Sequence, residues 1–552
     1  MTFQTRWGVP QCTLEDFETA FAGRHVLHRI VSEWARHKPE APAVISYDRG
    51  QAADWATLDR ASSILALDLL RRGFRKGDFL AAVLPMSLEH IYLEYACFKI
   101  GVVHAPLDLR LRPPEVLRCL EQIRPRGFAF LPPELAEPVR THSPFVSDII
   151  PQSMLAEIVA RDAAPETSGL QAAFETATAA VGEDDGAQVI FTTGSTGPPK
   201  PALLSHRNIT CQNLCLGAAF SFGEDTRLLL NLPPSHVGGQ AEALMTALFW
   251  GGTVIALEVF DPAKSLDAIR RHRANILGQI PAMFQFEWRL SDYGNYDLSS
   301  LQAAIYGGQQ ASRQFLERMA QMAPVIGTGL GLTETAGFCT YTPASASADE
   351  IFRGIGFDMP VYPMSIRRPM RDNGAAGEAL PDGEVGHICF RGPQSFLGYV
   401  NDPAATARTI SSDGFLYSGD IGWRDENGLH LSGRARWVIK PAGHQVFPGD
   451  IENHYCALED RIACCAAVGA EHRLLSEAVV AFVEKKPGAD FTIAELRRHA
   501  KGIASYMRPL HYVILEPGQM PLNRAAKIDY LRLSERARAE VDQLRVQGRW
   551  DR

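Results

Sequence analysis

The chain has 552 residues, of which 46% are hydrophobic and 21% are charged. This length predicts more than one domain, and the composition is typical of a globular protein with ordinary cores. The 55 basic and 63 acidic residues give a formal net charge of −8. That charge would repel a phosphate backbone unless the basic residues were strongly segregated, so we expect no nucleic-acid partner.

The ten cysteines are scattered without a CxxC pair, and the adjacent Cys464 and Cys465 lack partners at metal-ligand spacing. Reduced thiols are therefore expected. The N-terminal segment MTFQTRWGVPQCTLEDFETAF contains acids and lacks an apolar h-region. The longest weakly charged run, residues 243–257, is too short to span a bilayer and is interrupted by Gly251 and Gly252. We expect a soluble cytoplasmic protein with no membrane span.

From about residue 26, helix-like and strand-like segments alternate, as in LHRIVSEWARH, LAAVLPM and SLEHIYLEYACFKIG. Farther along, LLLNLPP and TVIAL indicate strands on either side of the helix-like AEALMTALFW. Asp261 and Pro262 are typical of the N-cap and first position of the next helix. Successive βαβ units of this kind predict an α/β fold with parallel-rich sheets. Residues 140–185 have weak periodicity, and we expect them to form a surface connection.

The Gly- and Pro-rich stretch from residue 428 to residue 452 precedes a compact tail. In that tail, AVVAFVEKK and HYVILEP indicate strands, and TIAELRRHAKGI indicates a helix in which Thr492 and Glu495 can form a capping box. We expect a large N-terminal domain of several subdomains, residues 1–433, and a small α+β C-terminal domain, residues 434–552.

The segment FTTGSTGPPK, residues 191–200, lies between the strand-like AQVIF and the helix-like SHRNITCQNLCL. Its glycines allow a backbone to wrap closely around phosphates, and its hydroxyls and lysine complement negative charge. It is not a Walker A loop, because two prolines separate the second glycine from the lysine. A triphosphate is the expected ligand, and a Gly/Ser/Thr surface loop is the alternative. The candidate residues are Thr192, Thr193, Gly194, Ser195, Thr196, Gly197 and Lys200.

This segment resembles the phosphate loop TSGTTGxPKG of the adenylate-forming superfamily, which includes acyl-CoA synthetases, nonribosomal peptide adenylation domains and luciferases. Other motifs follow in the family's order. GLGLTE at 329–334 resembles YGxTE, and YSGD at 417–420 resembles Y-x-TGD. The stretch at 433–452 resembles GRxDxxIKxxGxxIxPxEIE, and PLNRAAKID at 521–529 resembles PLxxxGKI. The resemblance covers about residues 26 to 535 and implies an ATP-dependent, AMP-forming ligase that joins a carboxylic acid to CoA.

The resemblance also implies roles for the nucleotide-binding residues. The residues from Thr192 to Lys200 would hold the β- and γ-phosphates, Thr333 would touch the α-phosphate, and Glu334 would ligate Mg²⁺. Asp420 would accept the ribose hydroxyls with support from Arg434. The remaining nucleotide-binding candidates are Gly308, Gln309, Leu330 and Gly331.

The C-terminal motifs imply a mobile domain. Lys527 would reach from it to bridge the acid and the α-phosphate and to stabilise the charge that develops during adenylation. Arg436 would occupy the hinge about which the domain swings between two poses, and Gly443 would let the pantetheine thiol pass close to the backbone. A solvated surface lysine is the alternative for Lys527.

The acid site is indicated by the segment NLPPSHVGGQ, in which His236 occupies a position near the acid and the adenylate in the family. A core or loop histidine is the alternative. Gly238 and Gly239 have no side chains to fill a pocket, so we expect room for a large acid. Phe284 and Tyr306, the latter just before Gly307, are candidate apolar walls that could equally be core residues.

Some positions depart from the family's pattern. Pro201 and Ala526 replace glycines beside Lys200 and Lys527, and Leu330 stands where an aromatic residue would stack on adenine. Arg436 replaces the usual Asp or Lys of the hinge.

Several alternatives stay open at this point. The acyl group could pass to the phosphopantetheine of a carrier protein instead of CoA, or the chain could be a degenerate nucleotide-binding homologue. The glycines beside His236 favour a bulky or long apolar acid. The sequence fits a monomer or a homodimer.

Overall fold

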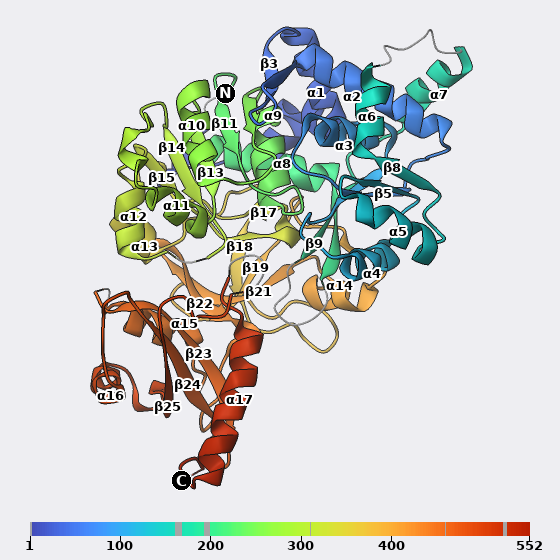
Figure 1. The fold of residues 1–552 in the computed structure, drawn as a ribbon. Coiled ribbons are helices and arrows are strands. Elements are labelled where there is room, and N and C mark those ends of the chain that lie inside the picture. The colour runs from blue at the N-terminus through green and yellow to red at the C-terminus, as the bar shows by residue number, and fades with distance from the viewer. Residues whose placement is uncertain are drawn as a thin grey trace. The chain divides into compact units, whose positions relative to one another are not determined.

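The computed structural model describes residues 3–160, 168–192, 199–309, 311–458, 460–522 and 527–551 (Figure 1). The chain divides into two compact units. The first contains the described residues up to Thr192, Pro199–Met364 and Phe390–Leu416. The second contains Ser365–Cys389 and the described residues from Tyr417 onward.

One sheet of the first unit has the strand order β15-β14-β13-β11-β12-β3-β4. The strands from β15 to β3 pair in parallel, and β4 pairs antiparallel with β3. Their buried aliphatic runs are typical of a parallel sheet covered on both faces, as the alternation of segments predicted. The strands are β3 (Pro42–Ser46), β4 (Gln51–Asp54), β11 (Arg227–Leu230), β12 (Thr253–Ala256), β13 (Ile276–Gln279), β14 (Ala303–Tyr306) and β15 (Val325–Gly327).

The crossovers of this sheet are helical. Asp261 caps α10 as expected, because its carboxylate accepts the N–H of Lys264 at 2.8 Å and Pro262 is the first helical residue. The helices in these connections and in the N-terminal part are α1 (Leu27–His37), α2 (Trp55–Arg71), α3 (Leu88–Ile100), η4 (Gly238–Met245), α9 (Thr246–Phe249), α10 (Pro262–His272), α11 (Pro281–Trp288), α12 (Arg313–Met319) and α13 (Ala348–Arg353).

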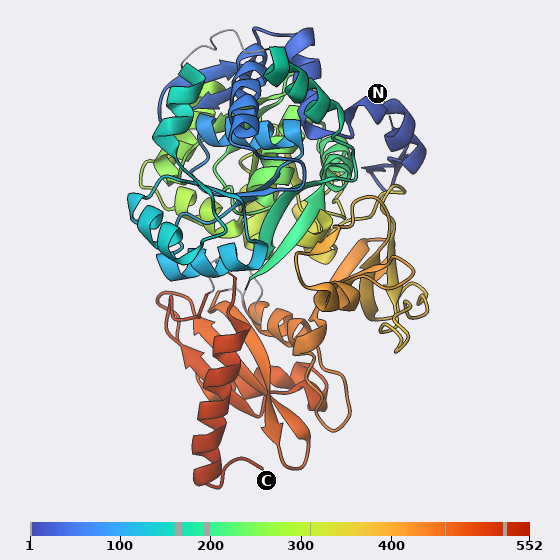
Figure 2. The same ribbon diagram turned by 90° about the vertical axis from the view of Figure 1, so that its right-hand side faces the viewer.

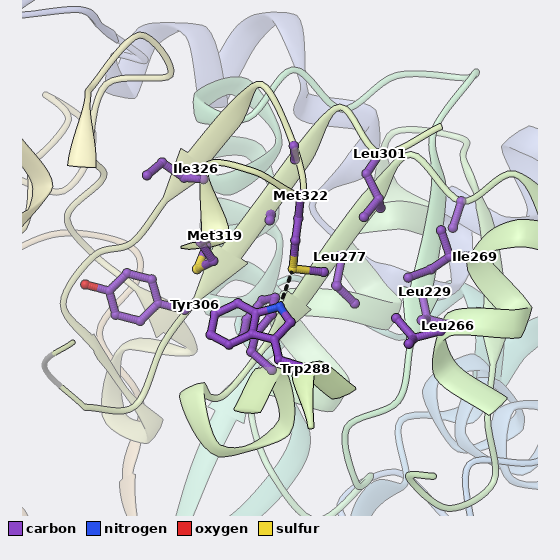
Figure 3. Packing of buried hydrophobic residues seen from close by; sticks show 14 of the residues in the cluster. Leu229, Leu266, Ile269, Leu277, Trp288, Leu301, Tyr306, Met319, Met322 and Ile326 are labelled. Atoms are coloured by element: carbon purple, nitrogen blue, oxygen red, sulfur yellow. Dashed lines mark hydrogen bonds between the residues drawn. The ribbon is translucent and has the colours of Figure 1, made fainter. Parts of the chain in front are cut away.

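A core cluster packs between one face of this sheet and its helices (Figure 3). Leu229 and Leu277 from the strands meet Leu266 and Ile269 from α10. Trp288 at the end of α11 donates its indole N–H to the sulfur of Met322 at 3.0 Å. This packing fixes where the loops at the strand ends emerge.

A second sheet of the first unit has the order β20-β10-β9-β6-β5-β7-β8. The strands from β9 to β8 run parallel, whereas β10 pairs antiparallel with both β9 and β20. The strands are β5 (Phe79–Val83), β6 (Val103–Pro106), β7 (Gly127–Phe130), β8 (Asp148–Pro151), β9 (Gly186–Thr192), β10 (Lys200–Ser205) and β20 (Gly398–Tyr399). The associated helices are α4 (Pro113–Ile123), α5 (Ala136–His142), α6 (Gln152–Ala160), α7 (Ser168–Ala179), α8 (His206–Ala219) and α14 (Pro403–Thr409).

The structure adds two features to what was expected of this region. The surface connection at 140–185 is partly helical, because its alanine-rich segments form α6 and α7, which contact α2. The residues after the phosphate loop form strand β10 before helix α8 begins at His206. Pairing with β9 and β20 therefore places a strand, and not a helix N-terminus, directly after the loop.

Short elements complete the first unit. They are β1 (Thr5–Arg6), β2 (Val9–Pro10), η1 (Asp16–Ala20), η2 (Ala22–Arg24), η3 (Pro133–Leu135), η5 (Tyr293–Asn295), β16 (Gly331–Leu332), η6 (Thr333–Thr335) and β17 (Gly337–Phe338). Strands β16 and β17 form an antiparallel hairpin in which Gly331 lies opposite Phe338. Within the described part of the chain, every helix falls short of the length and apolar character that a bilayer span requires.

The second unit contains most of a sheet with the order β18-β19-β21-β22 and a sheet with the order β23-β24-β25. Alternate residues of β23 and β24 face opposite sides, so one face packs on α15 and α16 and the other on α17 (Figure 2). The predicted α+β organisation is confirmed, and Thr492 and Glu495 form the expected capping box of α16. The elements are β18 (Met364–Arg367), β19 (Gly386–Phe390), β21 (Leu416–Asp425), β22 (Gly428–Arg434), η7 (Ala435–Trp437), α15 (Pro448–Cys456), β23 (Ile462–His472), β24 (Ser476–Lys485), α16 (Ile493–His499), η8 (Ala500–Gly502), η9 (Ser505–Met507), β25 (His511–Leu515) and α17 (Tyr530–Val546).

Candidate active site

The segments that follow β11, β13, β14 and β15 emerge at the same edge of their sheet, because carboxyl ends of parallel strands point the same way. Ligands of α/β proteins bind at this edge. The structure therefore gathers there, from distant parts of the sequence, the predicted residues that follow these strands. They are His236, Gly238, Gly239, Gly307, Gly308, Gln309, Leu330, Gly331, Thr333 and Glu334.

His236 lies just before helix η4 and is half-buried, so it is not an ordinary core histidine. Its carbonyl accepts the N–H groups of Gly239 at 3.0 Å and Gln240 at 3.1 Å, which ties it to the first turn of the helix. Its side chain also acts on Asp108, which follows β6 of the other sheet. Burial raises the pKa of Asp108, but hydrogen bonds and charge from Arg110, together with charge on His236, lower it overall. His236 and Asp108 therefore lie within electrostatic range of each other.

The glycines after His236 do not open a pocket, contrary to the reason for which we expected a large acid. A β-carbon at Gly239 would stand well inside van der Waals contact of the carbonyl oxygen of Pro233, so the close approach of two backbone segments requires glycine there. A β-carbon at Gly238 would lie 3.3 Å from a carboxylate oxygen of Glu242. The space beside both glycines is thus already occupied.

The two aromatic residues proposed as walls differ in their surroundings. Phe284 is fully buried, with its ring centroid 5.8 Å from those of both Trp288 and Phe315, so core packing accounts for it. Tyr306 belongs to the same cluster, and burial raises its pKa to about 12. Its hydroxyl points away from the cluster (Figure 3). Tyr306 is thus the better placed of the two to face the strand ends.

Phe338 is a residue of this edge that the sequence did not indicate. Its ring covers the glycines of two motif segments: a β-carbon at Gly331 would lie 2.8 Å from the ring, and one at Gly307 would lie 3.0 Å from it. Its N–H donates to Oε1 of Glu242 at 2.7 Å, and its carbonyl accepts the amide of Gln394 at 2.6 Å. Phe338 is therefore fixed by its backbone, and its ring takes up volume beside Gly307.

Glu334 lies in the short helix η6, and it is the last residue of the motif GLGLTE. Its Oε1 accepts the hydroxyl of Tyr399 at 2.5 Å, and its carbonyl accepts the N–H of Phe396 at 2.9 Å. Tyr399 is on β20, and its ring centroid is 5.0 Å from Nζ of Lys200, the lysine of the phosphate loop. Tyr399 thus joins two predicted residues, and only the pairing of β20 with β10 reveals this role.

The structure describes the first and last residues of the phosphate loop, Thr192 and Lys200. Thr192 ends β9 and Lys200 begins β10, and the N–H of Lys200 donates to Oγ1 of Thr192 at 3.4 Å. The predicted residues Thr193, Gly194, Ser195, Thr196 and Gly197 lie outside the described residues. After β14, Gly308 adopts a φ of +96°, a conformation that favours glycine, and Gln309 is exposed.

Leu330 is buried, at 7% exposure. Its N–H donates to Oγ1 of Thr340 at 2.8 Å and its carbonyl accepts the N–H of Cys339 at 2.8 Å. A β-carbon at the preceding Gly329 would overlap the carbonyl of Thr340. The backbone of this motif is therefore held firmly, and the leucine offers an aliphatic surface where the family usually has a ring.

Asp420 and Arg434 face each other across strands β21 and β22 of the second unit. Nε of Arg434 lies 2.8 Å from Oδ1 of Asp420, as the predicted supporting role requires. Gly419 has a φ of +78° within β21, so Asp420 follows a local distortion of a strand.

The other predicted residues of the second unit lie in short connections. Arg436 is in η7, where burial and the charge of Arg434 lower its pKa to about 10 against the opposing effect of Asp420. Gly443 has a φ of +84°, a backbone conformation that favours glycine. A β-carbon built at Gly443 would have no neighbour within 4 Å, so the space beside this residue is open. Lys527 is exposed. It lies beside the bridge between Leu522 and Ile528, and the replaced glycine position, Ala526, lies outside the described residues.

Two clusters of the described residues have ligand atoms close enough for a metal ion. In the first, Oε1 of Glu94 accepts the amide of Gln188 at 2.6 Å and lies 3.1 Å from Nδ1 of His104. One end of the Gln240 amide lies 3.0 Å from both oxygens of Glu94, and the other lies 3.2 Å from Nε2 of His90. Hydrogen bonds therefore occupy these ligand atoms, and we assign no metal there.

The second cluster contains Glu18, His25 and Glu183. Arg207 supplies its positive charge through ion pairs with Glu18 and with Glu183, the latter at 2.6 Å, and His25 Nδ1 lies 2.6 Å from Glu183. Glu334 remains the candidate for Mg²⁺. A half-buried carboxylate joined through Tyr399 to a phosphate-loop lysine suits an ion that is bound by one carboxylate together with phosphate oxygens.

Known proteins resemble this chain over nearly its whole length. A family model described as AMP-binding enzyme matches residues 31–400, and one described as AMP-binding enzyme C-terminal domain matches residues 450–527. A feruloyl-CoA synthase of Amycolatopsis sp is 29% identical over 475 residues, which is 85% of this chain and 91% of the relative.

A fatty acid–acyl-carrier-protein ligase, ScoC of Streptomyces coeruleorubidus, is 29% identical over 521 residues, 91% of this chain and 94% of the relative. Among solved structures, ATP-bound MatB from Rhodopseudomonas palustris superposes with a TM-score of 0.80 at 24% identity, covering 93% of this chain and 99% of that one. This likeness shows that the two chains share a fold.

Proposed function

Because the chain belongs to the AMP-binding enzyme family, we propose that it joins a carboxylic acid to coenzyme A with ATP, through an acyl-adenylate, and releases AMP and pyrophosphate. The observation that carries this proposal is the meeting of Glu334, Tyr399 and Lys200 at the strand edge that also holds His236. A carboxylate that suits Mg²⁺, a cation for phosphates and a half-buried histidine are the groups that acid activation needs.

In the first step, a carboxylate oxygen of the acid attacks the α-phosphorus, and the bond from that phosphorus to pyrophosphate breaks. Both reactants are anionic, so the site must neutralise them. Lys200 and the loop from Thr192 hold the β- and γ-phosphates, and Thr333 contacts the α-phosphate. Glu334 holds Mg²⁺, which when bound neutralises phosphate charge and orients the phosphates. His236 lies beside the acid and the adenylate.

The second unit provides the remaining nucleotide contacts. Asp420 accepts the ribose hydroxyls, and Arg434, 2.8 Å away, holds its carboxylate in place. Gly308, Gln309, Leu330 and Gly331 surround the base. Lys527 bridges the acid and the α-phosphate during adenylation, so its removal leaves the second step intact.

In the second step, the thiol of CoA attacks the carbonyl carbon of the adenylate and AMP leaves. Arg436 is the hinge between the two poses, residues 434–552 form the mobile domain, and the thiol passes Gly443. The open side of Gly443, which has no neighbour within 4 Å of a β-carbon, supports that path. A carrier-protein phosphopantetheine could replace CoA as the acceptor.

The acid is an apolar carboxylic acid, and Tyr306, Gly307 and Phe338 line the site that binds it. The aromatic ring of Phe338 beside Gly307 supports this assignment. So do the relatives, which are named for feruloyl-CoA and for a fatty acid. The free cysteines support the cytoplasm as the compartment.

The test measures acid-dependent exchange of labelled pyrophosphate into ATP over a panel of acids graded by size. CoA and a phosphopantetheinyl carrier protein are then offered as competing acceptors. We expect exchange with apolar acids and acylation of CoA. Lys527→Ala should lower exchange by about 10²–10³-fold, by analogy with the removal of one transition-state donor, and should keep thioester formation from a preformed acyl-adenylate. Full exchange in that variant would contradict the role of Lys527.

A further inference from the structure

An aromatic stack joins the hinge segment to the helix that follows Lys527. Trp437 is the last residue of η7, directly after the hinge residue Arg436, and Tyr530 is the first residue of α17. Their ring centroids are 5.6 Å apart and their planes differ by 28°. The guanidinium carbon of Arg436 lies 4.9 Å from the centroid of the Trp437 ring. Segments far apart in the sequence thus meet at these two rings.

Tyr530 is held at its hydroxyl as well as at its ring. The hydroxyl donates to Oε1 of Glu452 at 2.7 Å, and the same oxygen accepts the N–H of Ala467 at 2.9 Å. Glu452 is on α15 and Ala467 is on β23, so the hydrogen bonds anchor the start of α17 to the sheet of the second unit. Loss of this partly buried hydrogen bond would weaken the attachment, because Glu452 would then keep only the N–H of Ala467 on that oxygen.

The residues between Lys527 and Tyr530 are firmly attached to this anchor. The carboxylate of Asp529 caps α17 by accepting the N–H of Arg532 at 3.2 Å. The N–H of Asp529 donates to the carbonyl of Pro521 at 2.8 Å, and Ile528 bridges to Leu522. The position of Tyr530 therefore determines the position of the backbone at Lys527.

We infer that Trp437 and Tyr530 are positioning residues for adenylation: they fix Lys527 to the hinge segment, so that rotation at the hinge carries the lysine as part of one rigid body. This inference rests on the proposed function, in which Lys527 contacts the acid and the α-phosphate. Catalysis by a positioned group is sensitive to displacements of about 1 Å, which can cost on the order of 10²-fold. A lysine on a loosened segment would reach the phosphate less often without changing how ATP or the acid binds.

The test uses Tyr530→Phe, which removes the hydroxyl, and Trp437→Leu, which removes the ring. Each should lower kcat for pyrophosphate exchange by about tenfold with little change in KM for ATP or the acid. Thioester formation from a preformed acyl-adenylate should stay at the wild-type rate. In combination with Lys527→Ala, neither substitution should lower exchange further, because the lysine through which it acts is already gone.

Tyr455→Phe is the matched control. The hydroxyls of Tyr455 and Tyr512 are 2.7 Å apart on the opposite face of the same sheet, away from α17. This variant loses a buried hydroxyl in the same unit, so it should show a comparable fall in Tm with normal exchange. Hydrogen exchange gives a readout besides activity: the amides of residues 527–533 should exchange faster in Tyr530→Phe and Trp437→Leu than in Tyr455→Phe.

The inference is overturned if both test variants keep wild-type exchange rates, or if both half-reactions fall equally in them. It is also overturned if the substitutions add fully to Lys527→Ala. Failure of the proposed function gives a different pattern, in which the wild-type protein itself exchanges no pyrophosphate with any acid. Accelerated amide exchange at 527–533 in that case would still support the anchoring of this segment.

Discussion

The hydroxyl of Tyr399 lies 2.5 Å from Oε1 of Glu334, and the ring of the same tyrosine lies 5.0 Å from Nζ of Lys200. One side chain on a two-residue strand thus contacts the carboxylate proposed for Mg²⁺ and the lysine proposed for the phosphates. A hydrogen bond to a carboxylate fixes the direction of its oxygens as well as stabilising its charge. The geometry around Mg²⁺ and the phosphates therefore depends on Tyr399.

Tyr399→Phe should raise the Mg²⁺ concentration that half-saturates pyrophosphate exchange and lower kcat/KM for ATP by about 10–10²-fold. The reason is the loss of one hydrogen bond to a charged group, which contributes roughly 1.5–3 kcal/mol. The measurement is exchange as a function of Mg²⁺ at fixed ATP. Tyr362→Phe, which removes a hydroxyl 2.8 Å from Oγ of Ser395 in the same unit, is the control and should behave as wild type. Identical Mg²⁺ curves for both variants would count against the role of Tyr399.

Phe338→Ala should widen the range of acids. The ring covers Gly331 and Gly307, and its removal vacates space beside the strand end where the acid is proposed to lie. The ratio of kcat/KM for a bulky aryl acid to that for a compact acid should rise by about tenfold, since a large apolar group gains roughly 1–3 kcal/mol when it fits. Phe338→Leu should give a ratio between that of the wild-type protein and that of Phe338→Ala. Buried Phe→Ala substitutions destabilise by about 3–5 kcal/mol, so Tm is measured alongside. An unchanged order of acids in a folded variant would refute this prediction.

Gly239→Ala should impair folding more than Gly238→Ala. A β-carbon at Gly239 would collide with the carbonyl of Pro233, which is backbone and cannot rotate away. At Gly238 the nearest neighbour is the end of the Glu242 side chain, 3.3 Å away, which can move. We expect a loss of about 1–3 kcal/mol for the first and a few tenths for the second, by thermal or urea unfolding. Equal stability of the two variants would show that the turn before His236 can relax.

The cluster around Glu94 predicts a pH dependence of stability. Burial raises the pKa of Glu94 to about 8, although the charge of His90 and a hydrogen bond from Gln188 act to lower it. The folded protein therefore keeps a proton between about pH 4.5 and 8 that the unfolded chain releases, so this group's contribution to stability falls as pH rises through that window. Burial lowers the pKa of His90 and His104 to about 3, so below about pH 6.5 they favour the opposite slope.

Glu94→Gln should abolish the contribution of Glu94, which amounts to about 1.4 kcal/mol per pH unit. The clearest window is between pH 6.5 and 8. The histidines of the unfolded chain still titrate near pH 6.5, but they contribute to both proteins alike, so the difference between the two curves reports Glu94. The Tm of the wild-type protein should fall relative to that of Glu94→Gln across this range. Parallel curves would mean that Glu94 is ionised in the folded protein already at pH 6.5.

The sequence predicted the parts of the site that rest on local patterns. Strand-ending motifs placed Thr333 and Glu334 and located the ends of the phosphate loop, and the pair Asp420 and Arg434 meets as expected. Such patterns can be recognised in a sequence because glycines, turn residues and charges of a loop act on neighbours in the chain.

The residues that the sequence missed act across large separations. Tyr399 reaches Glu334 only because β20 pairs with β10, and Phe338 covers Gly307 only because the β16–β17 hairpin folds over the end of β14. The prediction that Gly239 leaves room for a pocket was wrong. The carbonyl of Pro233 excludes a β-carbon at this position, and it belongs to a turn whose path the sequence does not specify. Each of these contacts joins segments far apart in the sequence, and such a contact produces no periodic pattern of residues from which it could be predicted.

The attack of a carboxylate oxygen on the α-phosphorus of ATP is the central claim, and oxygen labelling tests it most directly. The protein is incubated with ATP, Mg²⁺, CoA and an apolar acid whose carboxylate carries ¹⁸O, and the products are analysed by mass spectrometry. The account predicts AMP with one ¹⁸O in its phosphate, formed together with unlabelled pyrophosphate and the acyl-CoA. Label in inorganic phosphate together with ADP, or thioester formation without labelled AMP, would contradict it.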